Sequence, residues 1–298
     1  MAPVDDLAAN ETQYIINISL ALVGLGLSLF ILAIIYTKKI YRTNTGKLLS
    51  SLLLCDSITA MFMIILSSLI INQLHHKINF MNWYRHLVVF LWLTTTSVIL
   101  SAFTLILISL ERYIAVKYPY VYSTYVRSSH IEIAISCSWL LVFVYGASGM
   151  TLGLLGKEDG FEMSSYGWII IVITSYIFLI TCNTALFFIA RSQLNSIASV
   201  ALTTNNKYLK KHKTMLKEIK AAKVCFGVVL AFTITYTPKF VDAIIQLVTD
   251  KNYPNKWHAM IIGYGIVLNT ILDPIIYALI NKNLKRSITQ IIPCCCCK

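Results

Sequence analysis

Charged residues are scarce in this chain of 298 residues: they make up 13% of it, whereas 57% is hydrophobic. A soluble domain carries about 25% charged residues, so the composition argues against a water-soluble enzyme. Intrinsic disorder is excluded as well, because disordered chains are too polar to bury a core. The net charge is +12, but the basic residues lie between long apolar blocks, which argues against a nucleic-acid partner. The composition indicates a membrane protein.

Seven apolar stretches are long enough to cross a bilayer as helices, which takes about 20 residues each. They cover 14–36, 48–71, 85–113, 131–155, 166–190, 219–248 and 257–280. The alternation typical of membrane β-strands is missing from runs such as 98–110 and 168–180. We therefore predict an all-α membrane protein, with a seven-transmembrane helix bundle over 14–280. It is flanked by an extracellular segment at 1–13 and, at 281–298, by a short amphipathic cytoplasmic helix and tail.

Lysine and arginine gather in the first, third and fifth connections and in the tail, and are few in the others. Because positive charge favours the cytoplasmic side, the N-terminus is predicted to lie outside, in the plasma membrane. Residues 1–13 lack a basic region and a cleavage site, so we expect no signal peptide. The sequon at Asn10 is a candidate glycosylation site, whereas the one at Asn17 lies too close to the first span.

Cysteine is absent from every segment expected to be extracellular, so no structural disulfide is predicted. The tail ends in a run of four adjacent cysteines, Cys294, Cys295, Cys296 and Cys297. After a basic amphipathic stretch, such a run is typical of palmitoylation. Metal binding is the alternative, but the run lacks the spacing of zinc ligands.

Several ionisable residues fall inside the apolar stretches, where each costs at least ~2.5–3.5 kcal/mol on insertion. Asp56 lies in the second stretch, Asp273 in the seventh, and Glu111 and Arg112 end the third. Such residues either satisfy one another as structural pairs or form a functional site.

Their motifs resemble those of a known family. Glu111-Arg112-Tyr113 closes the third stretch, and Asp273-Pro274-Ile275-Ile276-Tyr277 closes the seventh. Asp56 lies in the second, Trp139 in the fourth, and Phe232 and Pro238 in the sixth, each in the expected order. Over nearly its whole length the chain resembles rhodopsin-like (class A) G-protein-coupled receptors.

Departures from the common pattern narrow this resemblance. Leu87 replaces the usual cysteine of the third helix, Ser175 stands near the usual proline of the fifth, and Asp273 replaces asparagine. The combination is similar to the melanocortin, sphingosine-phosphate, cannabinoid and adenosine group. The ligand is not carried over, because the acidic ligand-binding positions of melanocortin receptors are Leu66, Leu87 and Leu91 here.

The resemblance implies a receptor that activates a heterotrimeric G protein by outward movement of helix six. Arg112 would pair with Glu111 and with Glu218 on helix six, while Pro238 and Pro274, beside Tyr277, would kink their helices. The alternative for the ion pair is a static surface salt bridge. Other readings of the whole chain are a small-solute transporter or channel, and a decoy receptor, which Leu27, Asn183 and Tyr236 keep open because they depart from the family's usual residues.

At mid-bundle the family arrangement would bring together Asp56, Ser101, Asn269 and Asp273. Two carboxylates with two neutral oxygen-bearing groups suit a sodium ion, a shared proton or a structural polar network. These three alternatives stay open, and no other cofactor is expected.

The outer half is expected to hold the ligand pocket, lined by Thr94, Val98, Tyr236, Lys239, Phe240, Asp242, Ala243, Tyr264 and Val267. Thr94 replaces the aspartate that would pair with an amine, and Val267 replaces the lysine that would hold retinal. Lys239 either meets an anionic head group, or pairs with Asp242 or extends toward the interface. We predict a lipid or a small acidic molecule as ligand, with a short peptide as the alternative. No set of residues typical of an enzyme is found.

Overall fold

A computed structural model describes the chain at residues 4–76, 80–155, 158–201, 226–241, 244–245, 256–280, 284 and 288. Every described element is helical, and six long helices make up most of the fold. They are α1 (Val4–Thr37), α2 (Asn44–His76), α3 (Phe80–Lys117), α5 (Ser128–Leu154), α6 (Glu158–Ala201) and α8 (Lys256–Ile280). The short helices η1 (Ile40–Arg42) and α4 (Pro119–Tyr125) lie in connections. The apolar helix Phe226–Val241 is called the sixth span below.

These helices correspond to the seven predicted spans, and several continue beyond the apolar stretches. Five of them are long and apolar enough to cross a membrane: Glu11–Thr37, Asn44–His75, Arg85–Lys117, Ser128–Leu154 and Tyr166–Ser192. The backbone of α6 stays helical as far as Ala201, well past the predicted end at residue 190. Similarly, α1 begins at Val4, so helix takes up most of the predicted extracellular segment.

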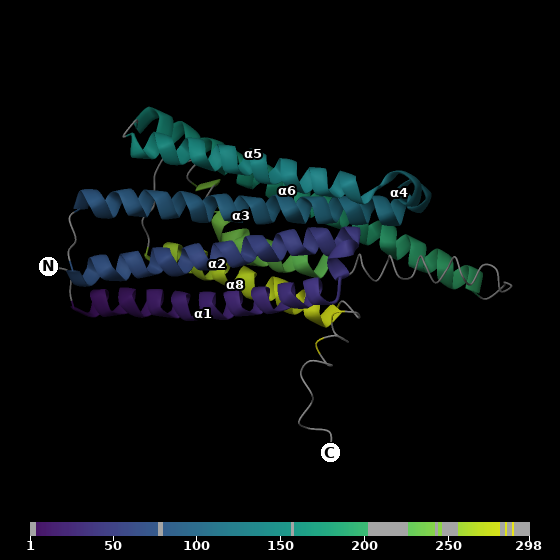
Figure 1. Ribbon diagram of the computed structural model, residues 1–298, viewed down its shortest axis with the longest axis horizontal. Coiled ribbons are helices and arrows are strands. Elements are labelled where there is room, and N and C mark those ends of the chain that lie inside the picture. The colour runs from purple at the N-terminus through teal and green to yellow at the C-terminus, as the bar shows by residue number, and fades with distance from the viewer. Residues whose placement is uncertain are drawn as a thin grey trace, which may run out of the picture.

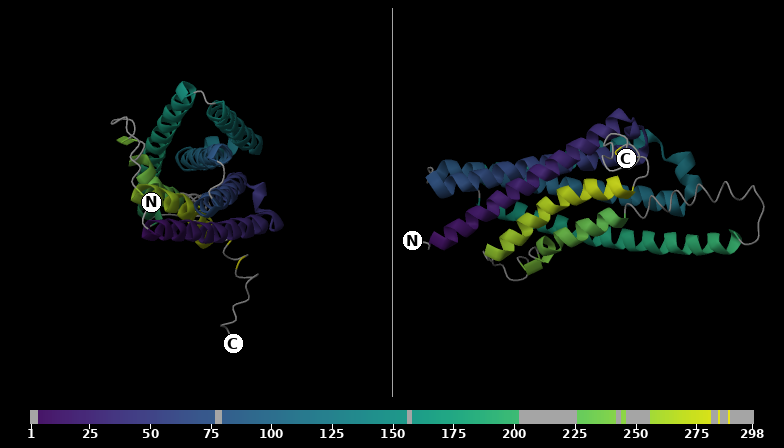
Figure 2. Two further views of the ribbon diagram at one scale, coloured as in Figure 1. Left: turned by 90° about the vertical axis from the view of Figure 1, so that its left-hand side faces the viewer. Right: turned by 90° about the horizontal axis from the view of Figure 1, so that it is seen from below.

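The long helices lie side by side in one bundle (Figure 1), and α3 is central to it. Helix α3 packs against α2, α4, α5 and α6, while α1 packs against α2 and α8. An end-on view shows α3 among the other helices (Figure 2). Of the most apolar 18-residue window of each span, 61% is buried in α3 but only 22% in α5. Polar residues in the middle of α3, such as Ser97, Ser101 and Thr104, are accordingly buried in the bundle.

The main hydrophobic core lies toward the end of the bundle that carries Arg112. Leu284 is fully buried in this core and Ile288 packs against it, so the chain returns to the bundle after α8. The rest of the predicted amphipathic helix and the cysteine run lie outside the described residues. Core side chains come from α1, α2, α3, α6, the sixth span and α8: Ile35, Leu48, Leu52, Leu105, Ile108, Leu179, Val228, Phe232 and Tyr277.

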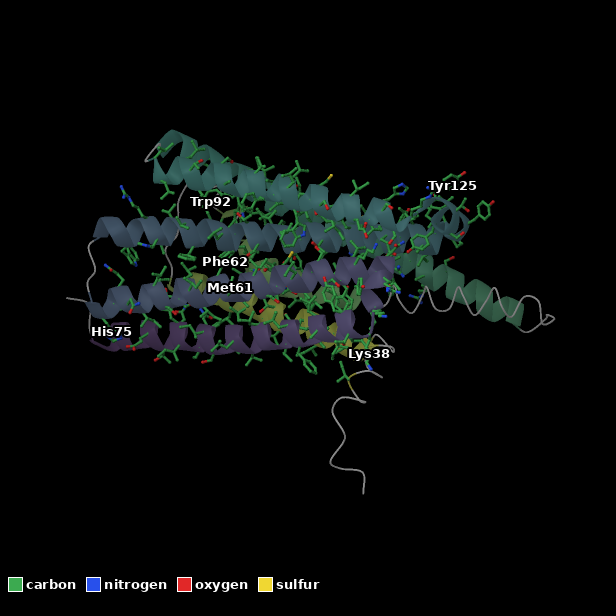
Figure 3. All side chains as sticks on the ribbon, in the orientation of Figure 1. Lys38, Met61, Phe62, His75, Trp92 and Tyr125 are labelled. Atoms are coloured by element: carbon green, nitrogen blue, oxygen red, sulfur yellow. The ribbon has the colours of Figure 1, made fainter. Side chains whose placement is uncertain are left out.

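Two glycines let α5 approach α3 closely. A Cβ atom built on Gly149 would lie 2.5 Å from the ring of Trp92, and one on Gly146 would overlap with Oγ1 of Thr96. Figure 3 labels Trp92 on α3, which α5 accompanies along the bundle. Larger residues at these two positions would push α5 away from α3.

Candidate functional site

At one end of the bundle, Arg112 and Glu111 form a doubly hydrogen-bonded ion pair on α3. Nε and Nη2 of Arg112 donate to the two carboxylate oxygens of Glu111. The side chains are only 5% and 2% exposed, respectively. The pair is therefore buried, and the surface salt bridge considered from the sequence does not describe it.

Neighbouring helices complete this pair. Nη2 of Arg112 also donates to Oγ1 of Thr45 on α2 at 2.7 Å. The hydroxyl of Tyr122 on α4 donates to Oε1 of Glu111 at 2.5 Å, and Nδ2 of Asn44 donates to the Tyr122 oxygen at 3.4 Å. The network thus joins α2, α3 and α4.

The hydroxyl of Tyr122 stays protonated, and so remains a hydrogen-bond donor, throughout the physiological pH range. Burial, and then the negative charge of Glu111, raise the pKa of Tyr122 to about 12. Sequence reasoning missed Tyr122, Thr45 and Asn44, because nothing in their local pattern shows that α4 and the start of α2 meet the end of α3.

The other predicted switch residues have different surroundings. Tyr113 accepts a hydrogen bond from Nζ of Lys117 at 2.7 Å, away from the buried pair. Tyr277 is 2% exposed in the main core. The backbone of α8 stays helical through Pro274, and Pro238 lies in the sixth span. Glu218 lies outside the described residues.

A further polar contact joins α3 and α6. Nδ2 of Asn183, which stands where the family usually has tyrosine, donates to Oγ of Ser109 at 3.2 Å. Both side chains are buried. Asn183 therefore forms a hydrogen bond between α6 and α3.

The four predicted mid-bundle residues gather around two buried carboxylates. Oγ of Ser101 donates to Oδ1 of Asp56 at 3.4 Å, and Nδ2 of Asn269 donates to Oδ2 of Asp273 at 3.2 Å. Thr235 joins them unpredicted, donating to Oδ1 of Asn269 at 3.3 Å. Asp56 and Asp273 are at most 1% exposed.

Each of these two carboxylates has one oxygen atom that accepts no hydrogen bond from the described residues. Within the described residues, Oδ2 of Asp56 and Oδ1 of Asp273 receive no hydrogen bond. Buried polar atoms are rarely left without a partner. Hard oxygen ligands of this kind fit a small cation, and a proton held between the two carboxylates fits equally well.

In the outer half, three of the predicted pocket residues line one apolar cavity. Val98 of α3 and Tyr236 and Lys239 of the sixth span face Trp168 of α6 across it. Nζ of Lys239 lies 4.5 Å from the centre of the Trp168 ring, a cation–π contact that the sequence did not predict. Other cavity walls come from Ile99, Ala102, Ile171, Val172, Ser175, Tyr176 and Phe232.

The other predicted pocket residues that the structure describes do not line this cavity. Thr94 is 4% exposed, and its hydroxyl donates to the carbonyl of Phe90 within α3 at 2.8 Å. Phe240 stacks on Tyr176 with ring centres 4.2 Å apart. Val267 is fully buried in a separate cluster, and Tyr264 is half-buried on α8. Asp242 and Ala243 lie outside the described residues.

The described residues contain no group of three or more histidine, cysteine, aspartate or glutamate side chains that could hold a metal ion. The side chain of Asn10 and the cysteines at 294–297 lie outside the described part of the chain. Asn17, in the second sequon, is only 3% exposed on α1.

The family profile and the relatives that match this chain all belong to one class of protein, the seven-transmembrane receptors. The profile of the "7 transmembrane receptor (rhodopsin family)" matches residues 28–277. Trace amine-associated receptors 7c and 7a of Rattus norvegicus are 28% identical to the chain over 211 and 209 residues, which is 64% of this chain and 58% of each relative. Trace amine-associated receptor 6 of Mus musculus is 28% identical over 210 residues, which is 64% of this chain and 60% of the relative. The chain thus spans about three fifths of the length of these relatives.

Proposed function

We propose a mechanism for this protein on the premise that it belongs to the rhodopsin family of seven-transmembrane receptors. The fold is accordingly a seven-transmembrane bundle, and the family consists of receptors rather than enzymes. The proposed function is to convert the binding of an extracellular ligand into activation of a heterotrimeric G protein. Outward movement of the sixth span would be the conformational step. The narrower resemblance to the melanocortin, sphingosine-phosphate, cannabinoid and adenosine group stays a prediction.

The observation that carries this proposal is the buried ion pair of Arg112 and Glu111. A buried charge that loses its partner is strongly destabilising, so Arg112 can leave Glu111 only where it gains another partner or water. In the closed state Arg112 is held by Glu111 and Thr45, and we propose Glu218 as a further partner. Outward movement of the sixth span would release Arg112 and open a groove for the apolar face of a G-protein helix.

The test needs no ligand. The full chain is reconstituted in lipid nanodiscs with a panel of G proteins, and ligand-independent nucleotide exchange is measured. Glu218→Ala is expected to raise exchange severalfold, because the closed state loses a contact. Arg112→Ala in the Glu218→Ala background is expected to abolish the increase. Unchanged exchange in both variants, at equal amounts of folded receptor, would contradict the proposed switch.

A conservative variant separates geometry from charge. Arg112→Lys keeps the positive charge but loses the planar fork that contacts both oxygens of Glu111. We expect it to raise ligand-independent exchange and to lower the yield of folded protein less than Arg112→Ala does. Arg85→Lys, the same substitution at an exposed arginine near the start of α3, is the matched control.

For the ligand we propose a lipid or a small acidic molecule, with a short peptide as the alternative. The support is Lys239, which rests on the ring of Trp168 at the wall of an apolar cavity of about 30 Å³. A ligand would therefore enter only as Lys239 and the sixth span move away from α6. A cation–π contact contributes about 0.5–2 kcal/mol, and a carboxylate or phosphate in a dry cavity competes well with it. Binding would draw Lys239 from α6 and so move the sixth span.

An amine is a poor fit, although the relatives are named for trace amines. Thr94 offers a hydroxyl, already bonded within α3, in place of a carboxylate. A protonated amine in the same cavity would also be repelled by Lys239.

At mid-bundle we propose that Asp56 and Asp273 hold either a sodium ion or a shared proton. A sodium ion would be held by their carboxylate oxygens together with oxygen atoms of Ser101 and Asn269. The two oxygens without hydrogen-bond donors support an occupant of this kind. When bound, the ion would neutralise the two carboxylates and tie α2 to α8.

We further propose a plasma-membrane location with the N-terminus outside, a glycan on Asn10 and acyl chains on Cys294–Cys297. The distribution of basic residues supports the orientation. Glycosidase treatment should lower the apparent mass of the wild-type protein but not of Asn10→Gln. Hydroxylamine should release acyl groups from the wild-type protein but not from a variant with four serines at 294–297.

A further inference from the structure

The hydroxyl of Tyr176 on α6 contacts the sixth span just before Pro238. It lies 2.7 Å from Oγ1 of Thr237 and donates to the carbonyl oxygen of Thr233 at 3.3 Å. Oγ1 of Thr237 donates to the same carbonyl at 2.7 Å, so the three groups form a closed triangle. Beyond Pro238, the ring of Tyr176 stacks on Phe240 with 17° between the planes. One side chain of α6 therefore contacts the sixth span before and after its proline.

These contacts all lie on one face of the sixth span. At about 100° per residue of α-helix, residues 233, 237 and 240 face α6 together, whereas Thr235 points to the opposite side. There, Oγ1 of Thr235 donates to Oδ1 of Asn269 on α8 at 3.3 Å, and a Cβ atom built on Gly265 of α8 would overlap with the carbonyl oxygen of Thr235. Figure 2 shows the sixth span, in light green, between α8 and α6. Tyr176 thus holds the side of the sixth span that faces α6.

Tyr176 also lines the cavity around Lys239, where α6 meets the sixth span. The cavity has about 30 Å³, which is room for about two water molecules. Its walls are α3, α6 and the sixth span. Because the hydrogen bond between Asn183 and Ser109 holds α6 to α3, the sixth span is the wall that moves when the cavity widens. A ligand that enters must therefore break the contacts of Tyr176.

The position of these contacts makes them costly to break. Thr237 and Ile234 are exposed on the outside of the bundle, where the membrane covers the span. A hydroxyl that leaves its partner there finds no water to replace it. Residues 226–232, in contrast, are all apolar, so their side chains make no hydrogen bond to α6. Apolar contacts between membrane helices are exchanged for lipid contacts at little cost, and the hydroxyl of Tyr176 is the firmer hold.

We propose that the hydroxyl of Tyr176 keeps the sixth span against α6 and so keeps the cavity around Lys239 closed. A ligand that enters the cavity separates the two helices, breaks the contacts with Thr233 and Thr237, and lets the sixth span move outward. Tyr176 is thus a positioning residue, which acts through the sixth span and not on Arg112. This inference rests on the proposed function, because it gives Tyr176 a part in the proposed movement.

Trp168 reports the closed cavity, because Nζ of Lys239 lies over its ring. The full chain is labelled with fluorotryptophan and studied by fluorine NMR in nanodiscs without ligand, and Trp168→Phe identifies the resonance of Trp168. Tyr176→Phe keeps the ring on Phe240 but removes the hydroxyl. We expect a second Trp168 resonance, from the open cavity, to gain an about fivefold larger share than in the wild-type protein. That factor corresponds to about 1 kcal/mol, the usual contribution of one hydrogen bond.

Further variants separate this hydrogen bond from a general loss of stability. Thr237→Val removes the partner hydroxyl at nearly equal size and should enlarge the second resonance to a similar extent. Tyr176→Phe and Thr237→Val together should do little more than either alone, because they remove the same hydrogen bond. Thr59→Val is the control, since it removes a 2.9 Å hydrogen bond to Ser97 between α2 and α3 and should leave the Trp168 resonance unchanged. Thermal unfolding of each variant checks that it is folded.

Two results would overturn the inference. One is an unchanged Trp168 resonance in both Tyr176→Phe and Thr237→Val. The other is an equal change in Thr59→Val, which would show a general loosening of the bundle. Nucleotide exchange on G proteins, measured with the same samples, tests the proposed function separately. A larger second resonance with higher exchange supports both, whereas a larger second resonance with unchanged exchange supports the role of Tyr176 and contradicts the proposed coupling.

Discussion

The hydroxyl of Tyr122 donates to Oε1 of Glu111 at 2.5 Å, so the short helix α4 holds the carboxylate that in turn holds Arg112. This contact links the connection between two spans to a buried ion pair. A movement of α4 that separated Tyr122 from Glu111 would remove one of the hydrogen bonds to that carboxylate.

Tyr122→Phe should raise ligand-independent G-protein activation severalfold. The change removes one hydrogen bond to a charged acceptor, which contributes about 1.5–3 kcal/mol, and so weakens the closed state. Nucleotide exchange at equal receptor amount measures the effect. Tyr120→Phe, on the same helix but 78% exposed, is the control. Equal exchange in the two variants would show that α4 does not hold the switch.

Lys239→Ala should weaken an acidic ligand about tenfold or more, the equivalent of ~1.4 kcal/mol. Lys239→Arg keeps the charge over Trp168 and should retain most of the affinity. Competition binding with acidic ligands found in a screen measures both. If both variants bind such a ligand as tightly as the wild-type protein does, Lys239 makes no contact with its acidic group.

Sodium should raise the unfolding temperature if the mid-bundle site holds that ion, because a ligand of the folded state stabilises it. Thermal unfolding is measured in sodium chloride and in choline chloride of equal ionic strength. Asp56→Asn should abolish the difference, and Glu132→Gln, outside the site, should keep it. If the two salts give the same unfolding temperature while stability still changes with pH, the shared proton is favoured instead.

Gly149→Ala should destabilise the bundle by about 1–3 kcal/mol, the usual cost of overpacking. The added methyl group would lie 2.5 Å from the ring of Trp92, a buried side chain that is only 6% exposed. Gly26→Ala is the matched control, since nothing lies within 4 Å of the same position on α1. Thermal unfolding in one detergent compares them, and equal stability would mean that α3 and α5 separate at little cost.

The number and order of the spans followed from the sequence because burial in lipid demands long apolar runs whatever the packing. Where helices end was less predictable: α6 continues to Ala201 because backbone hydrogen bonds propagate a helix beyond its apolar segment. The family was recognisable because Arg112, Asp56 and Asp273 are ionisable residues that cost free energy to insert into a membrane. They also lie at the positions in their spans where the family has its motifs.

The candidate site residues were only partly predictable, because a residue stands out in the sequence only where it differs from its apolar surroundings. Asp56, Ser101, Asn269 and Asp273 stood out as polar residues in apolar surroundings, and they do gather. Tyr122, Thr45 and Trp168 gave no such signal, because tyrosine, threonine and tryptophan are ordinary near membrane interfaces. Thr94 and Val267 have positions in the family pattern but not in the cavity around Lys239.

By itself, the sequence determined that the chain crosses the membrane as helices and that a few charges must be neutralised inside the bundle. Both follow from the free energy of transfer into lipid, which depends on composition and not on neighbours. Only the tertiary structure decided which atoms neutralise those charges. The answer depends on how helices far apart in the chain rotate and pack, as when α4 brings Tyr122 to Glu111 and α6 brings Trp168 to Lys239.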